Sequence, residues 1–277
     1  MSSAAPEGHA PDGHPPVGHL EDWAEVDDAD APWTRYERGE GASVILLHEL
    51  HGITPEVLGF GDFLVSSGFH VVIPHLFGVR GERPSGARTA GLALRMCVSL
   101  TFRALALGSD RPIARQLRAV VAAIAERSGG PVGVVGMCFT GGFALAAAVD
   151  PRVAAPVVSQ PAVPFPLPGP WRRDPGVSEA ELAEVQRRAA EEGLCVLGLR
   201  FSEDATSPAA RFDTLRDRLG AAFEVFELDS RPGNPDGFER DAHSVLTMEV
   251  RENPPNRAAA ARDRVAAFLH ERLDPSD

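Results

Sequence analysis

Short apolar runs alternate with amphipathic stretches along most of this 277-residue sequence, and this alternation limits the possible folds more than any other feature. The runs are rich in valine, isoleucine and leucine, which is typical of strands buried on both faces of a sheet. Strands that are joined by helices lie parallel, with helices covering both faces. We therefore predict an α/β fold with a mostly parallel central sheet. The predicted strands are residues 44–47, 69–73, 132–135, 153–158, 195–201 and 223–228.

Helix-start signals precede several of the stretches between these strands. Thr54 is a predicted N-cap with Pro55 at the first helical position, ahead of a helix over residues 57–65. Ser178 and Glu181 have the spacing of a capping box ahead of another helix. Further helices are predicted over residues 110–127, 143–149, 209–219 and 256–273.

The first 32 residues differ in composition from the rest of the chain. They are rich in proline, glycine, histidine and acidic residues, without an apolar pattern that would support order. Gly-His recurs there at Gly8-His9, Gly13-His14 and Gly18-His19. We predict a disordered leader over residues 1–32, with a metal-binding tail as the alternative because imidazoles are common metal ligands. One domain with a substantial buried core is predicted over residues 33–277.

The charge and the distribution of apolar residues exclude several classes of protein. A formal net charge of −12 argues against a nucleic-acid-binding protein, which would normally carry a basic face. The N-terminus lacks the pattern of a secretory signal, and no apolar run reaches the length of a membrane span. The sequence therefore predicts a cytoplasmic protein without a nucleic-acid or membrane partner.

The three cysteines are too few, and odd in number, for a disulfide framework. Cys97 lies in an apolar stretch with helical spacing, and Cys195 lies in the apolar run of residues 194–199. Both are predicted to be small buried core residues. Cys138 has a different setting.

Cys138 lies within Gly136–Gly142, directly after the third predicted strand and before a helix. Ligands of parallel α/β sheets bind beyond the carboxyl ends of the strands, and small neighbours permit a tight turn that exposes a reactive side chain. The N-terminus of the following helix favours a thiolate, and its amides can stabilise an oxyanion, with Phe139 N–H as the first donor. A buried structural cysteine is the alternative. Thr140 and Gly141 depart from the usual Gly-x-nucleophile-x-Gly pattern.

Two further residues follow later strands in the order nucleophile, acid, histidine that is expected of an α/β-hydrolase. Asp204 follows the fifth predicted strand, and His243 follows the sixth across a loop that contains glycine and proline. His243 would accept the thiol proton and later deliver it to the leaving group, while Asp204 would fix the imidazole tautomer. Glu203 and Asp241 are nearby carboxylates that could take the place of Asp204.

The loop His48–Gly52 follows the first predicted strand and would face Cys138. Leu50 N–H could then serve as the second oxyanion donor. Glu49 is unusual in this position, because a carboxylate close to a thiol disfavours the thiolate. A solvated loop acid is the alternative for Glu49.

Four motifs make the chain resemble the dienelactone hydrolase family, which includes carboxymethylenebutenolidase. They are His48-Glu49 with Gly52, the turn Gly136–Gly142, Asp204 with Pro208, and Ala242-His243-Ser244. The resemblance runs from about Trp33 to the C-terminal helix. It implies an α/β-hydrolase fold and hydrolysis of a small ester or lactone through a covalent acyl-enzyme, without a metal or an organic cofactor. It also implies a triad of Cys138, His243 and Asp204, with Glu49 in contact with the resting thiol.

The residues that would contact substrate depart from the family pattern. The dienelactone enzymes grip a substrate carboxylate with arginines, one of which follows the second strand, where Arg80 or Arg83 could serve. The other comes shortly after the histidine, where this sequence has residues 245–248 and no arginine. His51 and Phe77 are further candidates for the pocket lining.

Other functions are compatible with the same residues. A broader carboxylesterase or thioesterase would use the same triad, and a non-catalytic small-molecule-binding module could retain the same fold. The protein is predicted to be a monomer or a homodimer.

Overall fold

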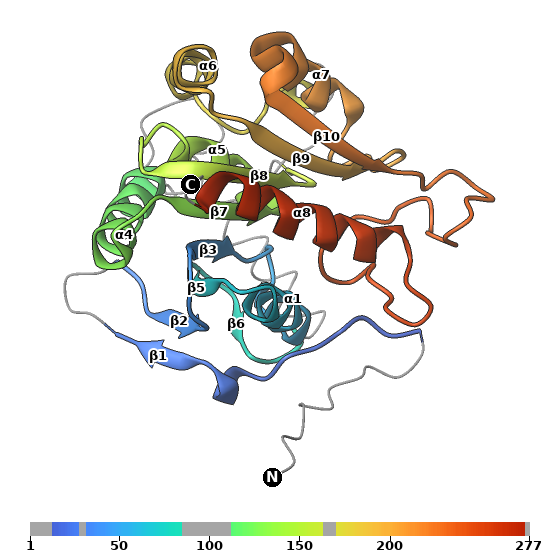
Figure 1. The fold of residues 1–277 in the computed structure, drawn as a ribbon. Helices are drawn as coiled ribbons and strands as arrows, with labels where there is room; N and C mark the ends of the chain where they lie inside the picture. Colours follow the sequence, from blue (N-terminus) through green and yellow to red (C-terminus); the bar gives the residue numbers. More distant parts are fainter. Residues whose placement is uncertain (1–12, 28–31, 85–111, 163–169, 275–277) are drawn as a thin grey trace.

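The inner strands of the sheet are buried on both faces, as their apolar composition predicts. The computed structural model describes residues 13–27, 32–84, 112–162 and 170–274, and all structural statements concern these residues. They form an eight-stranded sheet in the order β1-β2-β5-β3-β7-β8-β9-β10 (Figure 1). Strands β5, β3, β7, β8, β9 and β10 run parallel to one another. At one edge, β2 pairs antiparallel with β5, and β1 pairs antiparallel with β2. The strands are β1 (Ala24–Val26), β2 (Arg35–Arg38), β3 (Ser43–Leu47), β5 (His70–Pro74), β7 (Val132–Met137), β8 (Val153–Ser159), β9 (Val196–Phe201) and β10 (Phe223–Leu228).

Alternate residues of each strand enter two separate hydrophobic layers. In β3, Val44 and Leu46 pack into one layer, whereas Ile45 and Leu47 pack into the other. The first layer contains α1 (Pro55–Ser66) and α8 (Arg257–Leu273), and Figure 1 shows α8 crossing in front of the sheet. The second contains α4 (Pro112–Ser128), α5 (Gly141–Ala147), α6 (Glu179–Glu192) and α7 (Ala209–Leu219). The predicted α/β architecture, with helices on both faces, is therefore confirmed.

The predicted helix starts agree with the structure wherever it describes them. Thr54 caps α1, with its hydroxyl accepting a hydrogen bond from Val57 N at 3.4 Å. Ser178 and Glu181 form the predicted capping box of α6. Asp110, the first residue of the helix predicted over residues 110–127, lies outside the described residues.

The folded part begins before the predicted boundary at residue 32. Strand β1 pairs with β2, and Gly18 N donates a hydrogen bond to Pro55 O at 2.8 Å. Trp23 is only 5% exposed, and its ring packs so closely on Gly61 that a Cβ there would lie 2.7 Å away. These tertiary contacts hold part of a segment whose proline and glycine content suggested a disordered leader. Residues 1–12, including His9, lie outside the described residues.

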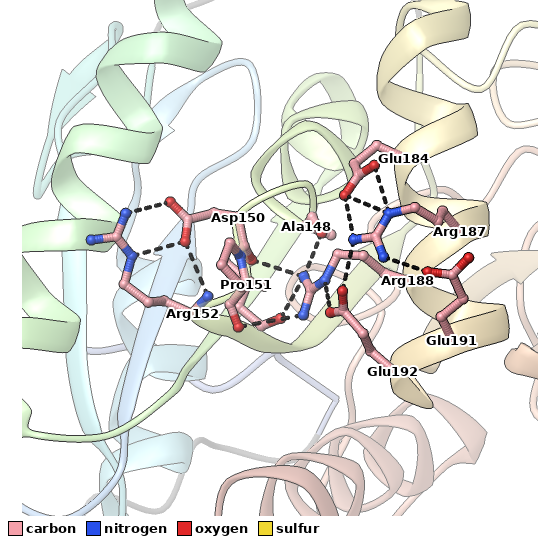
Figure 2. Close-up of polar contacts among 10 residues, drawn as sticks. Ala148, Asp150, Pro151, Arg152, Glu184, Arg187, Arg188, Glu191 and Glu192 are labelled. Atoms are coloured by element: carbon pink, nitrogen blue, oxygen red, sulfur yellow. Dashed lines mark hydrogen bonds and ion pairs between the residues drawn. The ribbon is translucent and has the colours of Figure 1, made fainter.

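A buried arginine joins α6 to the turn between α5 and β8 (Figure 2). Arg188 Nη1 donates to the carbonyl oxygens of Ala148, Asp150 and Val153, at 2.6, 2.8 and 3.1 Å. Carbonyls at a helix end lack intrahelical partners, and a guanidinium satisfies several at once. Arg188 therefore fixes the end of the helix that follows Cys138.

The other two cysteines differ from Cys138 in setting. Cys195 is only partly buried, and its sulfur lies 3.0 Å from Arg272 Nη2, so it is at the edge of the predicted core rather than inside it. Cys97 lies outside the described residues. In the part of the chain that the structure describes, no helix combines the length and the apolarity that crossing a membrane would require.

Candidate active site

Cys138 occupies a sharp turn between β7 and α5. Its φ is +53°, a value that few residues other than glycine adopt, so the surrounding structure must hold it there. Gly136 is required just before it, because a Cβ at this position would lie 2.3 Å from Thr140 O. The turn Cys138–Thr140 is a short 3-10 helix that leads directly into α5. The thiol is thereby presented at the carboxyl end of the sheet.

Thr140 explains the departure from the usual glycine pattern. Its hydroxyl is fully buried and accepts a hydrogen bond from Met137 N at 3.0 Å. The same oxygen lies 3.1 Å from both Leu47 O and His48 O, to which its single proton can be donated. Thr140 therefore links the turn that carries Cys138 to the end of β3. The glycine one place later, Gly141, packs against Pro161, where a Cβ would lie 2.8 Å away.

His243 and Asp204 form a close pair. His243 Nδ1 lies 2.6 Å from Asp204 Oδ2, and Asp204 is 4% exposed. The other carboxylate oxygen, Oδ1, accepts hydrogen bonds from Thr206 N, Thr206 Oγ1 and Ser207 N at 2.9, 2.7 and 3.2 Å. The alternative acids lie elsewhere, since Glu203 pairs with Arg240 at 3.3 Å and Asp241 is exposed. The geometry thus favours Asp204 as the partner of the imidazole.

The electrostatics of this pair favour the charged form of both groups. Burial opposes a charge on His243, but Asp204 and the Cys138 thiol, which both hydrogen-bond to the imidazole, outweigh it and raise its pKa to about 11. Burial likewise opposes a charge on Asp204, yet His243 and Thr206 lower the pKa of its carboxyl group. Nε2 is the imidazole nitrogen left for Cys138, because Asp204 engages Nδ1.

The pair gives the stability of the protein a definite pH dependence. The pKa of His243 is raised from 6.5, so its contribution is full below pH 6.5 and is lost as the pH rises toward about 11. The pKa of Asp204 is lowered from 3.8, so its contribution is full above that value and is lost on acidification. We expect wild type to exceed His243→Gln in unfolding free energy by more at about pH 6 than at about pH 9.5. Chemical denaturation at the two pH values measures this difference, and an unchanged difference would contradict the ion pair.

The loop after β3 is fixed by a buried neutral histidine. Burial lowers the pKa of His48 to about 3, despite its hydrogen bond with Glu49 O. Leu76 N donates to His48 Nε2 at 3.1 Å, so Nδ1 carries the proton and donates to Glu49 O at 2.8 Å. Among the described residues, none accepts a hydrogen bond from Leu50 N–H. That amide can therefore serve an incoming oxyanion.

The Glu49 carboxylate is enclosed by neutral donors. Glu49 is 6% exposed and accepts hydrogen bonds from Gln160 Nε2 at 2.9 Å, Thr247 Oγ1 at 3.1 Å and Ser244 Oγ at 3.2 Å. The Cys138 thiol is not among its hydrogen-bond partners in the described part of the chain. Neither Gln160 nor Thr206 was predicted from the sequence. Gln160 directly follows the end of β8, and Thr206 lies two residues after Asp204.

A buried arginine ties together loops beside the triad. Arg211, in α7, is 2% exposed, and burial lowers its pKa to about 10, so it stays charged at neutral pH. Its guanidinium donates to the carbonyl oxygens of Thr206 at 2.9 Å, Trp171 at 3.3 Å and Pro161. The loop that carries Asp204 is thereby joined to the loop that follows β8.

Two of the predicted pocket residues, Phe77 and His51, lie in or next to the loops that follow β3 and β5. Phe77 packs edge-on against His48 and Phe139, with ring centroids 4.8 and 5.9 Å apart, which brings it to the turn that follows Cys138. The backbone of His51 is held by Val79 N at 2.9 Å.

The two candidate arginines have protein partners instead. Arg80 Nε donates to His75 Nδ1 at 3.1 Å, and Arg83 Nε donates to Glu56 at 2.7 Å. A role for either in gripping a substrate carboxylate therefore stays a prediction. Within the described residues, no three side chains of the metal-binding types cluster closely enough to hold a metal ion.

Comparison with known proteins shows the family to which the chain belongs. A family model described as the dienelactone hydrolase family matches residues 34–273. The chain belongs to the dienelactone hydrolase family. Carboxymethylenebutenolidase of Rhodococcus opacus is 26% identical to it over 226 residues, covering 81% of this chain and 78% of that protein. The resemblance seen in the four sequence motifs is thus confirmed.

Solved structures agree on the fold of this dienelactone hydrolase family member. The protein TT1662 from Thermus thermophilus superimposes with a TM-score of 0.56 at 16% identity, covering 92% of this chain and 99% of that one. A dienelactone hydrolase-like promiscuous phosphotriesterase from metagenomic libraries gives a TM-score of 0.59 at 14% identity, covering 94% and 100%. At such identities these likenesses show the α/β-hydrolase fold alone. Family membership supports a hydrolase that acts on ester bonds of small ester or lactone substrates.

Proposed function

We propose that this protein hydrolyses small esters or lactones through a thioester acyl-enzyme on Cys138, with His243 as acid and base and Asp204 as the residue that orients the imidazole. The observation that carries the proposal is the meeting of three strand ends. Cys138 is held at φ +53° after β7, and it faces a histidine that is bonded to Asp204 at 2.6 Å. A nucleophile, a base and an orienting group in contact are the requirement for covalent catalysis.

The reaction would proceed in two balanced steps. The Cys138 thiolate attacks the carbonyl carbon, a C–S bond forms, and the electron pair of the C=O π bond moves to oxygen. Leu50 N–H and Phe139 N–H would stabilise that oxyanion. When the tetrahedral species collapses, the C–O bond to the leaving group breaks, and the departing oxygen takes the proton from protonated His243.

Hydrolysis of the thioester reverses these roles. His243 removes a proton from water, the resulting hydroxide adds to the carbonyl carbon, and collapse breaks the C–S bond. The carboxylic acid product leaves, and the cysteine and the histidine return to their starting state. With a lactone as substrate, the leaving alcohol stays attached to the acyl group, so ring opening and acylation are the same step.

Two other functions fit the same geometry. A broader carboxylesterase or thioesterase would use the same residues, and the substrates that are turned over decide between them. A non-catalytic binding module would keep the fold but form no acyl-enzyme. The cytoplasmic location and the monomeric or homodimeric state remain predictions from the sequence.

Trapping the acyl-enzyme tests the proposal directly. Wild type would be mixed with enol lactones and activated short-chain esters, quenched with acid within the first turnover, digested and analysed by mass spectrometry. We expect the mass of the acyl group on the peptide that contains Cys138, together with a burst of released alcohol when the substrate is an ester. Turnover without any adduct on Cys138, or an adduct on another residue, would overturn the assignment.

A further inference from the structure

The strand after the nucleophile strand also ends in an unusual backbone conformation. Residues Met137 and Ser159 are paired in the register of β7 and β8, so Cys138 and Gln160 leave the sheet side by side. They are the non-glycine residues with positive φ in the described chain, at +53° and +32°. Ala162 N donates to Cys138 O at 2.9 Å and joins the two turns. Two neighbouring strained turns indicate that the position of Gln160 is as closely specified as that of the nucleophile.

The side chain of Gln160 is fixed at both ends. Gln160 is completely buried, its backbone N–H donates to Leu199 O at 2.6 Å, and its side-chain oxygen accepts a hydrogen bond from Ser159. Because that oxygen is occupied, the amide nitrogen must point the other way, where it donates to Glu49 Oε1 at 2.9 Å. The orientation of the amide is thereby determined by its partners.

Gln160, Ser244 and Thr247 surround one carboxylate from two sides. Glu49 comes from the loop after β3, Gln160 follows β8, and the other two donors lie just after His243. Every one of these hydrogen bonds goes to a carboxylate oxygen, so the set satisfies an ionised Glu49 without help from the thiol. If Glu49 lost its donor on Gln160, Oε1 would keep only the hydrogen bond from Thr247, and the carboxylate would be held less firmly.

We propose that Gln160 is a positioning residue that holds the Glu49 carboxylate against Ser244 and Thr247 and away from the Cys138 thiol. A carboxylate next to a thiol disfavours the thiolate by charge repulsion and can accept the thiol proton in a hydrogen bond. Keeping Glu49 on its three neutral donors leaves the thiol to His243. Gln160 thus acts on the nucleophile through Glu49.

Other charged groups around the thiol must be considered in any pH measurement. His243, with Asp204 behind it, faces Cys138 from the loop after β10. Glu249 lies nearby on the same loop, where burial raises its pKa and Arg251, Asp241, Glu49 and His243 also act on it. His48, next to Glu49, is neutral across the usable pH range. A change at Gln160 alters none of these side chains, but a shift of Glu49 also acts on Glu249, so the Glu49→Gln background is needed as a reference.

The test is the pH dependence of Cys138 alkylation by iodoacetamide in the full chain, followed by mass spectrometry of the Cys138 peptide. Gln160→Met keeps the size of the side chain but removes the donor, and we expect the midpoint to rise by about one pH unit. Alkylation at a pH below both midpoints would then be about tenfold slower. Gln160→Asn keeps an amide and tolerates the positive φ but is one methylene shorter, so it should shift the midpoint in the same direction. It decides the matter if Gln160→Met does not fold.

The Glu49→Gln background separates positioning from a general structural effect. Without the carboxylate charge, Gln160→Met and Gln160→Asn should leave the midpoint within about 0.3 units of the Glu49→Gln parent. Ser43→Ala is the matched control, because it removes another buried hydroxyl hydrogen bond, to His70 at 3.1 Å, and it should not shift the midpoint. An unchanged midpoint in the single Gln160 variants, or an equal shift in the Glu49→Gln background, would overturn the proposal.

The assigned role rests on Cys138 being the nucleophile proposed above, but the two ideas can fail separately. Alkylation needs no substrate, so an inert ester panel would count against the hydrolase function and leave the midpoint measurement valid. In the active enzyme, Gln160→Met should lower kcat about tenfold with little change in KM, because substrate contacts are retained. A rise in KM alone, with an unchanged alkylation midpoint, would count against a positioning role for Gln160.

Discussion

Cys138→Ala is expected to lower kcat for ester or lactone hydrolysis by about 10⁴-fold or more. The substitution removes the proposed nucleophile, so any remaining rate would come from binding and the oxyanion donors. Alanine at φ +53° adds no bulk beyond the cysteine it replaces, so the variant should keep the fold. The measurement is steady-state hydrolysis of the ester and lactone panel at matched enzyme concentration, with circular dichroism to verify folding.

Two further variants sharpen this result. Cys138→Ser keeps an oxygen nucleophile in the same turn, and we expect it to be at least about 10²-fold slower than wild type because a hydroxyl ionises far less readily than a thiol. Cys195→Ala is the matched cysteine control, since Cys195 is partly buried beside Arg272 and precedes β9, whereas Asp204 follows the other end of that strand. It should retain full activity. Equal rates for wild type and Cys138→Ala would mean that another residue performs the attack.

Asp204→Asn should reduce kcat by about 10³- to 10⁴-fold while leaving the fold intact. Asparagine retains one oxygen for Thr206 N and Ser207 N, but its amide nitrogen would face His243 Nδ1. The imidazole would then carry its proton on Nε2, which could no longer accept the proton of the thiol. Because the same substitution removes the ion pair with His243, the melting temperature should fall. Loss of rate with an unchanged circular dichroism spectrum, measured on the same preparation, would support this tautomer effect.

Controls for Asp204→Asn come from the two neighbouring acids. Glu203→Gln removes the partner of Arg240, and Asp241→Asn alters an exposed side chain. Each is expected to change kcat less than about threefold, because neither reaches the imidazole. If Glu203→Gln or Asp241→Asn proved as damaging as Asp204→Asn, the imidazole would have a different acid partner during turnover than in the structure.

The central sheet was predictable because burial on both faces leaves a plain apolar signal. Strand β2, which lies between the edge strand β1 and β5, lacks such a signal. Its sequence Arg-Tyr-Glu-Arg is mostly polar, yet Tyr36 is 2% exposed and the strand pairs with β5. Strand β1 depends on that pairing and on Trp23, so its order comes from tertiary contact rather than from local pattern. Predictions based on composition alone therefore placed the boundary of the domain too late.

In the candidate site, too, some residues could be predicted from the local sequence pattern and others depend on tertiary contacts. Cys138, Asp204 and His243 could be found because each follows a strand at the same edge of the sheet. That rule also marks Gln160, which directly follows β8, but its partner lies 111 residues earlier in the chain. Only the register between neighbouring strands brings such residues together. The resemblance implied a thiol contact for Glu49, whereas the structure shows that side chains from two distant loops occupy its oxygens.

The order of the strands has a consequence for how the protein is made. Each strand from β8 to β10 pairs with the strand that precedes it in the sequence, so the sheet can widen at one edge as the chain leaves the ribosome. The turn that carries Cys138 is synthesised about midway, but Glu49 finds Ser244 and Thr247 only after a further 195 and 198 residues of chain, counted from Glu49 itself. A nascent or prematurely terminated product therefore holds a cysteine without its histidine. If Cys138 and His243 act together as proposed, only chains that extend past His243 would hydrolyse substrate.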